Sequence, residues 1–297
     1  MATARSDAPL MQLDRIGGNA YSTMPATLLS VLIPLYNEEE FVAPLIERVL
    51  QAPLPEGMER EIIVVDDGSR DGSAEIVAEL AARYPEIRVL RHERNRGKSA
   101  AIRTAIDQAR GDYSIIQDAD LEYDPTDLPA VVGPVLRGEA RAVYGSRVLG
   151  GQQGRPWYSP YRLAVAGLNR LARLLYGQRL TDHATCYKAL PTELWRALDL
   201  RAERFEVCAE VTAKLGRLGI PIQEVGISYR PRTRAEGKKI GWRDGLAAAR
   251  TFIRWRFAAV APSGPAEIRV LPGAAGRPPS PMAILPGFIS RTPRPAA

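Results

Sequence analysis

The sequence predicts an α/β fold in which helices flank a mostly parallel central sheet, followed by a helical, basic C-terminal part. Short runs rich in valine and isoleucine alternate with helical patterns through the first half of the chain, which is the spacing of β-α-β units. Acidic turns follow two of these runs, and the second half is richer in arginine. The 297 residues are 45% hydrophobic and 25% charged, as in globular domains and unlike collagen-like or disordered chains.

The runs at residues 29–34 and 61–66 are mainly apolar, as in strands that are covered on both faces of a parallel sheet. We expect strands at residues 29–34, 61–66, 87–90, 113–117, 142–144 and 222–229. We expect a helix that opens at Asn37, a residue suited to capping, and helices at residues 73–83, 98–109, 126–136, 161–176, 192–198, 205–218 and 242–257.

Composition divides the chain into four parts. Residues 1–27 lack the apolar core of a secretory signal and are expected to form a flexible leader. Residues 28–229 form the main domain, and residues 230–257 form a basic loop and an amphipathic helix. Nine prolines fall among the last 40 residues, so residues 258–297 are expected to be extended or disordered.

Charge is distributed unevenly between the two halves. Residues 1–150 carry 16 basic and 24 acidic side chains, a formal charge of −8, whereas residues 151–297 carry +14. An acidic half suits metal ions, and a basic half suits phosphate groups or an anionic membrane surface. The two cysteines and two histidines of the sequence argue against a zinc centre, and no apolar run approaches the ~18 residues that span a bilayer.

An acidic run follows the strand expected at residues 113–117. Side chains two positions apart on an extended segment point the same way, so Asp118, Asp120 and Glu122 are expected to converge. Neighbouring carboxylates repel one another unless a cation lies between them, and hard oxygen ligands favour Mg²⁺ or Mn²⁺. Ligands of open parallel sheets bind beyond the carboxyl ends of the strands, which favours a metal site over a solvated acidic loop.

A second acidic turn, at Asp66 and Asp67, follows the strand expected at residues 61–66. A carboxylate there can accept a hydrogen bond from the imide N–H of uracil or guanine, or from a ribose hydroxyl. Helix capping is the alternative use, but Asp71 and Ser73 suffice for that purpose.

Four motifs, in this order, resemble those of the family 2 glycosyltransferases with the GT-A fold. They are Ile33-Pro34-Leu35-Tyr36-Asn37-Glu38, Val65-Asp66-Asp67-Gly68-Ser69, Asn95-x-Gly97-Lys98 and Asp118-Ala119-Asp120. Within that family the chain resembles the polyprenyl-phosphate (dolichol-phosphate) sugar synthases over about residues 28–257. Three further segments carry this likeness: Gly145-Ser146-Arg147, Thr185-Cys186-Tyr187-Lys188 and Glu236-Gly237-Lys238-Lys239-Ile240.

The resemblance implies an inverting enzyme that moves a hexose from a nucleotide sugar to a polyprenyl phosphate, with Mg²⁺ or Mn²⁺ as cofactor. It implies a nucleotide-sugar site that includes Pro34, Tyr36, Glu38, Asp66 and Asp67. It also implies that Asp118 and Asp120 hold the metal ion, with Glu122 as a further ligand. GDP-mannose and UDP-glucose both fit, because Asp66 can serve either base.

Two arginines are implied at the acceptor phosphate. Arg147 matches the arginine with which the family grips the lipid phosphate, and we assign it a catalytic role with the two aspartates. Arg162 is the nearest candidate for the second arginine, although its position differs from the family pattern by about one residue. The serine that usually follows one turn later is replaced here by Val165 or Ala166.

Further basic residues suggest a lid and a membrane contact. Arg230 and Lys238 belong to a basic loop expected to close over the donor diphosphate, which Lys98 is also expected to reach. The helix at 242–257 places apolar and arginine side chains on separate stripes, as in helices that lie at a membrane surface; a helix packed on the core is equally compatible. We therefore expect a cytoplasmic protein held on the inner face of the membrane.

Two other functions fit the sequence. A transferase acting on a hydroxyl acceptor needs a general base, for which Asp182, His183 and Glu210 are candidates. A phosphate acceptor needs none, since its second pKa of about 6 leaves it ionised near neutral pH. The second of these other functions is that of a non-catalytic module that binds lipid or nucleic acid. The acidic first half gives a nucleic-acid binder no advantage, so no nucleic-acid partner is expected.

Overall fold

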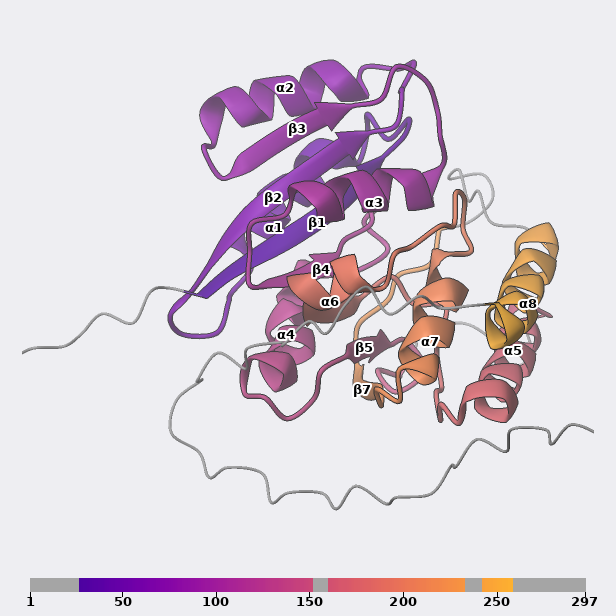
Figure 1. Ribbon diagram of the computed structural model, residues 1–297. Coiled ribbons are helices and arrows are strands. Elements are labelled where there is room, and N and C mark those ends of the chain that lie inside the picture. Colours follow the sequence, from indigo (N-terminus) through magenta and orange to yellow (C-terminus); the bar gives the residue numbers. More distant parts are fainter. Residues whose placement is uncertain (1–26, 152–159, 233–241, 259–297) are drawn as a thin grey trace, which may run out of the picture.

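The computed structural model describes residues 27–151, 160–232 and 242–258 (Figure 1). The expected leader up to residue 26, the tail from residue 259 and Lys238 lie outside these residues. A seven-stranded sheet has the order β3-β2-β1-β4-β6-β5-β7, with helices packed against it, so the expected α/β class is confirmed. The strands are β1 Thr27–Leu35, β2 Met58–Asp66, β3 Ile87–Arg91, β4 Tyr113–Ile116, β5 Val143–Ser146, β6 Lys188–Pro191 and β7 Gln223–Gly226.

Most strand pairs are parallel, and β6 is the exception. Strand β1 pairs in parallel with β2 and β4, β2 with β3, and β5 with β7. Strand β6 lies between β4 and β5 and runs antiparallel to both. Sequence reasoning missed β6 because its four residues begin with a lysine and end with a proline, which hides the apolar run.

Helices connect the strands at the expected places, with one correction. The helices are α1 Val42–Gln51, α2 Ser73–Arg83, α3 Lys98–Gln108, α4 Leu128–Leu136, α5 Pro160–Tyr176, α6 Thr192–Ala197, α7 Val207–Arg217 and α8 Trp242–Phe257. The expectation that a helix opens at Asn37 is wrong, because α1 begins five residues later and Asn37 has a φ of 51°. Its side chain instead accepts a hydrogen bond from the Arg70 N–H at 2.9 Å, so Asn37 fastens the β1–α1 loop to the β2–α2 turn.

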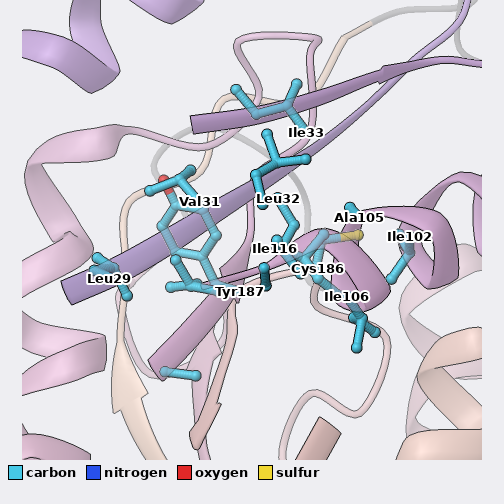
Figure 2. Close-up of a cluster of buried hydrophobic side chains, with 14 of the residues drawn as sticks. Leu29, Val31, Leu32, Ile33, Ile102, Ala105, Ile106, Ile116, Cys186 and Tyr187 are labelled. Atoms are coloured by element: carbon cyan, nitrogen blue, oxygen red, sulfur yellow. The ribbon is translucent and has the colours of Figure 1, made fainter. Parts of the chain in front are cut away.

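The core explains why the strand runs are continuous. Leu29, Val31, Leu32 and Ile33 of β1 are all fully buried, because alternate side chains of a central strand meet helices on opposite faces. Figure 2 shows these side chains with those of α3, which packs against β1 and β2. The interior of the sheet therefore fixes the positions of the loops at the carboxyl ends of β1, β2 and β4.

Helices α5, α7 and α8 form a second, smaller core, and α5 and α8 lie side by side at one end of the molecule (Figure 1). Phe252 and Trp255 of α8 are buried there, whereas Leu246, Ile253 and Phe257 of the same helix are 52%, 50% and 81% exposed. Helix α8 thus both packs on the protein and presents an apolar face to solvent. None of the helices in the described ranges is long and apolar enough to cross a membrane.

Candidate active site

A pocket of about 360 Å³ lies at the carboxyl edge of β1, β2 and β4. It brings together nine of the residues that the sequence assigned to the site: Pro34, Tyr36, Glu38, Asp67, Lys98, Asp118, Asp120, Glu122 and Arg147. Asp66 is fully buried and is not among the lining residues. Arg230 lines a neighbouring cavity, which shares Asp120 and Glu122 with this pocket.

The acidic segment after β4 is a turn and not an extended strand. Leu121 has a φ of 56°, so the expected extended conformation is wrong, although all three carboxylates line the same pocket as expected. Asp118 Oδ1 lies 2.6 Å from Lys98 Nζ, at the first residue of α3. The Lys98 ammonium is thus the positive charge that already lies beside this buried carboxylate.

Asp120 and Glu122 have different surroundings in the same pocket. Both Glu122 carboxylate oxygens are used, since they accept hydrogen bonds from the Tyr229 hydroxyl and from the Arg232 N–H. Asp120 Oδ2 lies 3.3 Å from the Arg232 guanidinium. Burial, reinforced by repulsion from Asp118 and Glu122, raises the pKa of Asp120 to about 7. An additional positive charge beside Asp120 is therefore favourable.

Two of the three ligands expected from the sequence are suited to a divalent cation. Asp118 and Asp120 offer hard carboxylate oxygens, of the kind that Mg²⁺ and Mn²⁺ bind, in surroundings where added positive charge is favourable. Within the described ranges, no group of three or more Asp, Glu, His or Cys side chains is arranged to hold a metal ion, and Glu122 is committed to Tyr229 and Arg232. The residues therefore fit a metal ion held by the two aspartates.

Arg232 is a site residue that sequence reasoning left within the basic loop. Its guanidinium donates to Glu38 Oε2 at 2.8 Å as well as contacting Asp120. It thereby joins the β1–α1 loop to the acidic turn across the mouth of the pocket. In the sequence, Arg232 is one of a run of basic residues with nothing to distinguish it from the others. In the structure, Arg232 lines both the pocket and the neighbouring cavity, whereas Arg230 lines the cavity and not the pocket.

Asp66 ends β2, and Asp67 follows it at the wall of the pocket. Asp67 accepts hydrogen bonds from the Arg96 and Gly97 N–H groups at 2.9 and 2.7 Å and contacts His92 Nδ1 at 2.7 Å. Asp66 accepts the Ser69 N–H at 2.9 Å and forms an ion pair with a neighbouring arginine. Both carboxylates are thus engaged with the protein, and their expected contacts with the base and ribose stay a prediction.

Arg147 is held at the pocket by a buried ion pair. Its Nε and Nη2 atoms donate to the two Asp182 oxygens at 2.6 and 2.7 Å, and its guanidinium lies over the Tyr229 ring, 4.9 Å from the centroid. Although burial opposes ionisation, Arg147 keeps the pKa of Asp182 below its usual value. The arginine is therefore charged, oriented and directed at the pocket.

Arg147 also lines a second hollow, of about 750 Å³, which we call the basic groove. Its apolar lining includes Val148, Leu163, Val165, Ala166 and Leu180, and its arginines are Arg147, Arg162, Arg170, Arg173 and Arg179. Arg162 thus lies in the basic groove beside Arg147 and does not line the donor pocket. Arg170 and Arg173 were missed because helical spacing alone does not show what a helix faces, and Arg179 lies in the loop that follows α5.

The three candidate bases have structural roles. His183 is buried, contacts Asn169 Oδ1 through Nδ1 at 2.7 Å, and burial lowers its pKa to about 3. Glu210 is buried in an ion pair with Lys214 at 2.7 Å, and Asp182 is paired with Arg147. None of the three lines the pocket that holds Asp118 and Asp120.

Comparison with known proteins identifies the family. The pattern of glycosyl transferase family 2 matches residues 30–195, more than half of the chain. The chain belongs to glycosyl transferase family 2. The match begins in β1 and ends in α6, so it contains the whole acidic edge of the sheet, and the expected family membership is confirmed.

Relatives in this family include named polyprenyl-phosphate sugar transferases. A dolichol-phosphate mannosyltransferase of Pyrococcus furiosus is 30% identical over 215 residues, which are 72% of this chain and 59% of that protein. One of Mycosarcoma maydis is 28% identical over 79% of this chain and 81% of its own length. An undecaprenyl-phosphate 4-deoxy-4-formamido-L-arabinose transferase of Pectobacterium carotovorum is 38% identical over 54% of this chain and 48% of that enzyme. The chain thus spans only about half to three fifths of two of these relatives.

Solved structures of low identity share the fold. Glucosyl-3-phosphoglycerate synthase of Mycobacterium tuberculosis superposes with a TM-score of 0.56 at 24% identity, over 79% of this chain and 80% of that one. The S. aureus TarS structure with UDP-GlcNAc gives a TM-score of 0.52 at 18% identity, over 76% and 66% of the two chains. These neighbours confirm the expected GT-A fold.

Proposed function

We propose that the protein is an inverting, metal-dependent glycosyltransferase that moves a hexose from a nucleotide diphosphate sugar to a polyprenyl phosphate. One observation carries the proposal: Arg147 lines both the acidic donor pocket and the basic groove. A phosphate bound by this guanidinium lies at the boundary between a site suited to a nucleotide sugar and a groove suited to an apolar chain with an anionic head. The names of the relatives support the same substrate class.

The donor end of the site depends on the two aspartates. Asp118 and Asp120 would hold Mg²⁺ or Mn²⁺, which when bound supplies Lewis-acid stabilisation to the leaving diphosphate. A glucosyl-3-phosphoglycerate synthase of the same fold was solved with Mn²⁺ and UDP, which supports this cofactor. Lys98 and Arg232 already contact the same carboxylates, so their charges can stabilise the diphosphate as its negative charge grows.

A phosphate acceptor agrees with the lack of a suitable base among the candidates. An ionised phosphate oxygen can attack the anomeric carbon directly, whereas a hydroxyl must lose a proton. His183 is neutral and buried, and Asp182 and Glu210 are held in ion pairs and do not line the donor pocket. Positioning by Arg147 and charge stabilisation then supply most of the rate. The geometry favours a phosphate acceptor over a hydroxyl one.

A membrane surface is the proposed location of the acceptor, on the inner, cytoplasmic face. The basic groove lies along α5, and α5 and α8 expose Leu163, Leu174, Leu246, Ile253 and Phe257. Arginines lie between these apolar side chains on both helices. Apolar side chains set among arginines bind anionic bilayers through both burial and charge. A polyprenyl chain in such a bilayer reaches the groove without leaving the lipid.

A donor screen tests the proposal. Calorimetry with Mn²⁺ and GDP-mannose, UDP-glucose or UDP-N-acetylglucosamine is expected to give saturable binding of one nucleotide sugar, which also decides between GDP and UDP. The Asp120→Ala variant is expected to remove that binding, whereas the Asp107→Ala variant, on the exposed side of α3, is expected to keep it. If none of the three donors binds to the wild-type protein, the proposal is wrong.

A further inference from the structure

The two cysteines of the chain meet at the wall of the donor pocket. Cys186 lies two residues before β6 and lines the pocket, and Cys208 lies in the first turn of α7. Their side chains interact with each other, and Cys208 Sγ contacts the residue that precedes Cys186. In its thiol form Cys208 also donates to the Thr185 carbonyl oxygen at 3.4 Å. The fold thus brings together the only two thiols among 297 residues.

The surroundings of the pair favour reaction at one sulfur. Cys208 is partly exposed, and the hydrogen bond from Cys186 lowers the pKa of Cys208 to about 6, although burial opposes this. A thiolate is the form that reacts with peroxides and disulfides. Cys186 is the buried partner, with its sulfur 3.1 Å from Lys98 Nζ, and Figure 2 shows it among the core side chains of α3.

We propose that Cys186 and Cys208 form a reversible disulfide when the protein meets hydrogen peroxide. The Cys208 thiolate attacks one peroxide oxygen, the O–O bond breaks, and hydroxide leaves to give a sulfenic acid. The Cys186 sulfur then attacks the Cys208 sulfur, the S–O bond breaks, and the thiol proton leaves with the oxygen as water. Two thiols and one peroxide thus become one disulfide and two waters.

We expect the Cys186–Cys208 disulfide to change the donor pocket through Lys98. The Lys98 ammonium donates to Cys186 Sγ and forms an ion pair with Asp118 Oδ1 at 2.6 Å. Oxidation removes the negative charge of the Cys208 thiolate, which attracts the Lys98 ammonium, so Lys98 is left more strongly bound to Asp118. The bond also ties the segment around Cys186 to the start of α7, next to Phe205, which lines the same pocket. This effect on the donor site rests on the proposed function, whereas formation of the bond does not.

Mass spectrometry of the full chain tests the bond directly. The reduced protein is treated with hydrogen peroxide, and formation of one disulfide is expected to lower the intact mass by about 2 Da. Dithiothreitol is expected to restore the mass, and peptide mapping is expected to join Cys186 to Cys208. The Cys208→Ser and Cys186→Ser variants are each expected to show no such loss. A wild-type protein that keeps two titratable thiols, or that forms only linked dimers or oxygen adducts, overturns the proposal.

Binding of Mn²⁺ with UDP or GDP to the reduced and oxidised wild-type protein tests the effect on the pocket. We expect the oxidised form to bind about fivefold more weakly, as the loss of one hydrogen bond implies, and Cys208→Ser to be insensitive to peroxide. Equal affinity of the two forms refutes the link to the pocket. If neither form binds either nucleotide, the proposed function fails, and the mass measurement still decides whether the disulfide forms.

Discussion

The Asp182→Asn substitution probes the ion pair that orients Arg147. The two side chains are 6% and 2% exposed and share two hydrogen bonds. Removing one charge of a buried pair leaves the other uncompensated, at a cost of about 3–5 kcal/mol. Because asparagine keeps one oxygen that can accept from Arg147, we expect a loss of about 3 kcal/mol in the free energy of unfolding.

Urea unfolding of the wild type and variant measures this loss. Glu139→Gln is the matched control, since Glu139 binds Arg137 with the same two-hydrogen-bond geometry, at 2.7 and 3.0 Å, on the exposed surface. The control is expected to change stability far less, because solvent screens exposed pairs. In a transfer assay, Asp182→Asn is expected to raise KM for the lipid phosphate and to leave donor affinity unchanged. If Asp182→Asn costs no more stability than the control, the ion pair does not hold Arg147 in the way described.

Three further predictions concern the metal, the pocket loop and a buried imidazole. Asp120→Asn is expected to abolish transfer in a radiolabel assay without lowering the melting temperature, whereas Asp107→Asn keeps activity; retained turnover in the first variant rules out the metal assignment. Gly97 has a φ of 95°, and a Cβ there would lie 2.3 Å from a backbone oxygen, so Gly97→Ala is expected to unfold at lower urea than Gly138→Ala, whose Cβ would meet no atom within 4 Å. His183 has its pKa lowered to about 3, so its ring resonances are expected to stay constant from about pH 5 to 8. The unfolded chain protonates His183 near pH 6.5, whereas the folded protein does so only near pH 3. The contribution of His183 to stability is therefore fully present above pH 6.5 and is lost as the pH falls from about 6.5 to about 3. A ring resonance that shifts near pH 6.5 contradicts the burial.

The sheet was largely predictable because its strands are buried on both faces. The runs that end at Pro34, Asp66 and Gln117 are continuous and apolar, so they stand out from any helical pattern. The parallel order of these strands then brings Asp67 and Asp118 to one edge. The prediction of a helix that opens at Asn37 failed because an asparagine side chain that can cap a helix can also join two loops through a hydrogen bond.

The details of the site depend on contacts between distant segments. Glu122 pairs with residues that follow β7, and Asp67 is used by the loop that leads into α3. No local pattern reveals that a carboxylate is already engaged in this way. The arginines of the basic groove are likewise brought together by the packing of α5 against its neighbours, and their role becomes visible only in the fold.

The central claim is that Arg147 presents a phosphate acceptor to a donor held at Asp118 and Asp120. The most direct measurement compares polyprenyl phosphate with the corresponding polyprenol as acceptor for the donor that binds, with products separated and weighed by mass spectrometry. The account predicts a glycosylated polyprenyl phosphate from wild-type protein, no product with the polyprenol, and a large loss in Arg147→Gln. Equal transfer to the polyprenol, or full activity in Arg147→Gln, would contradict it.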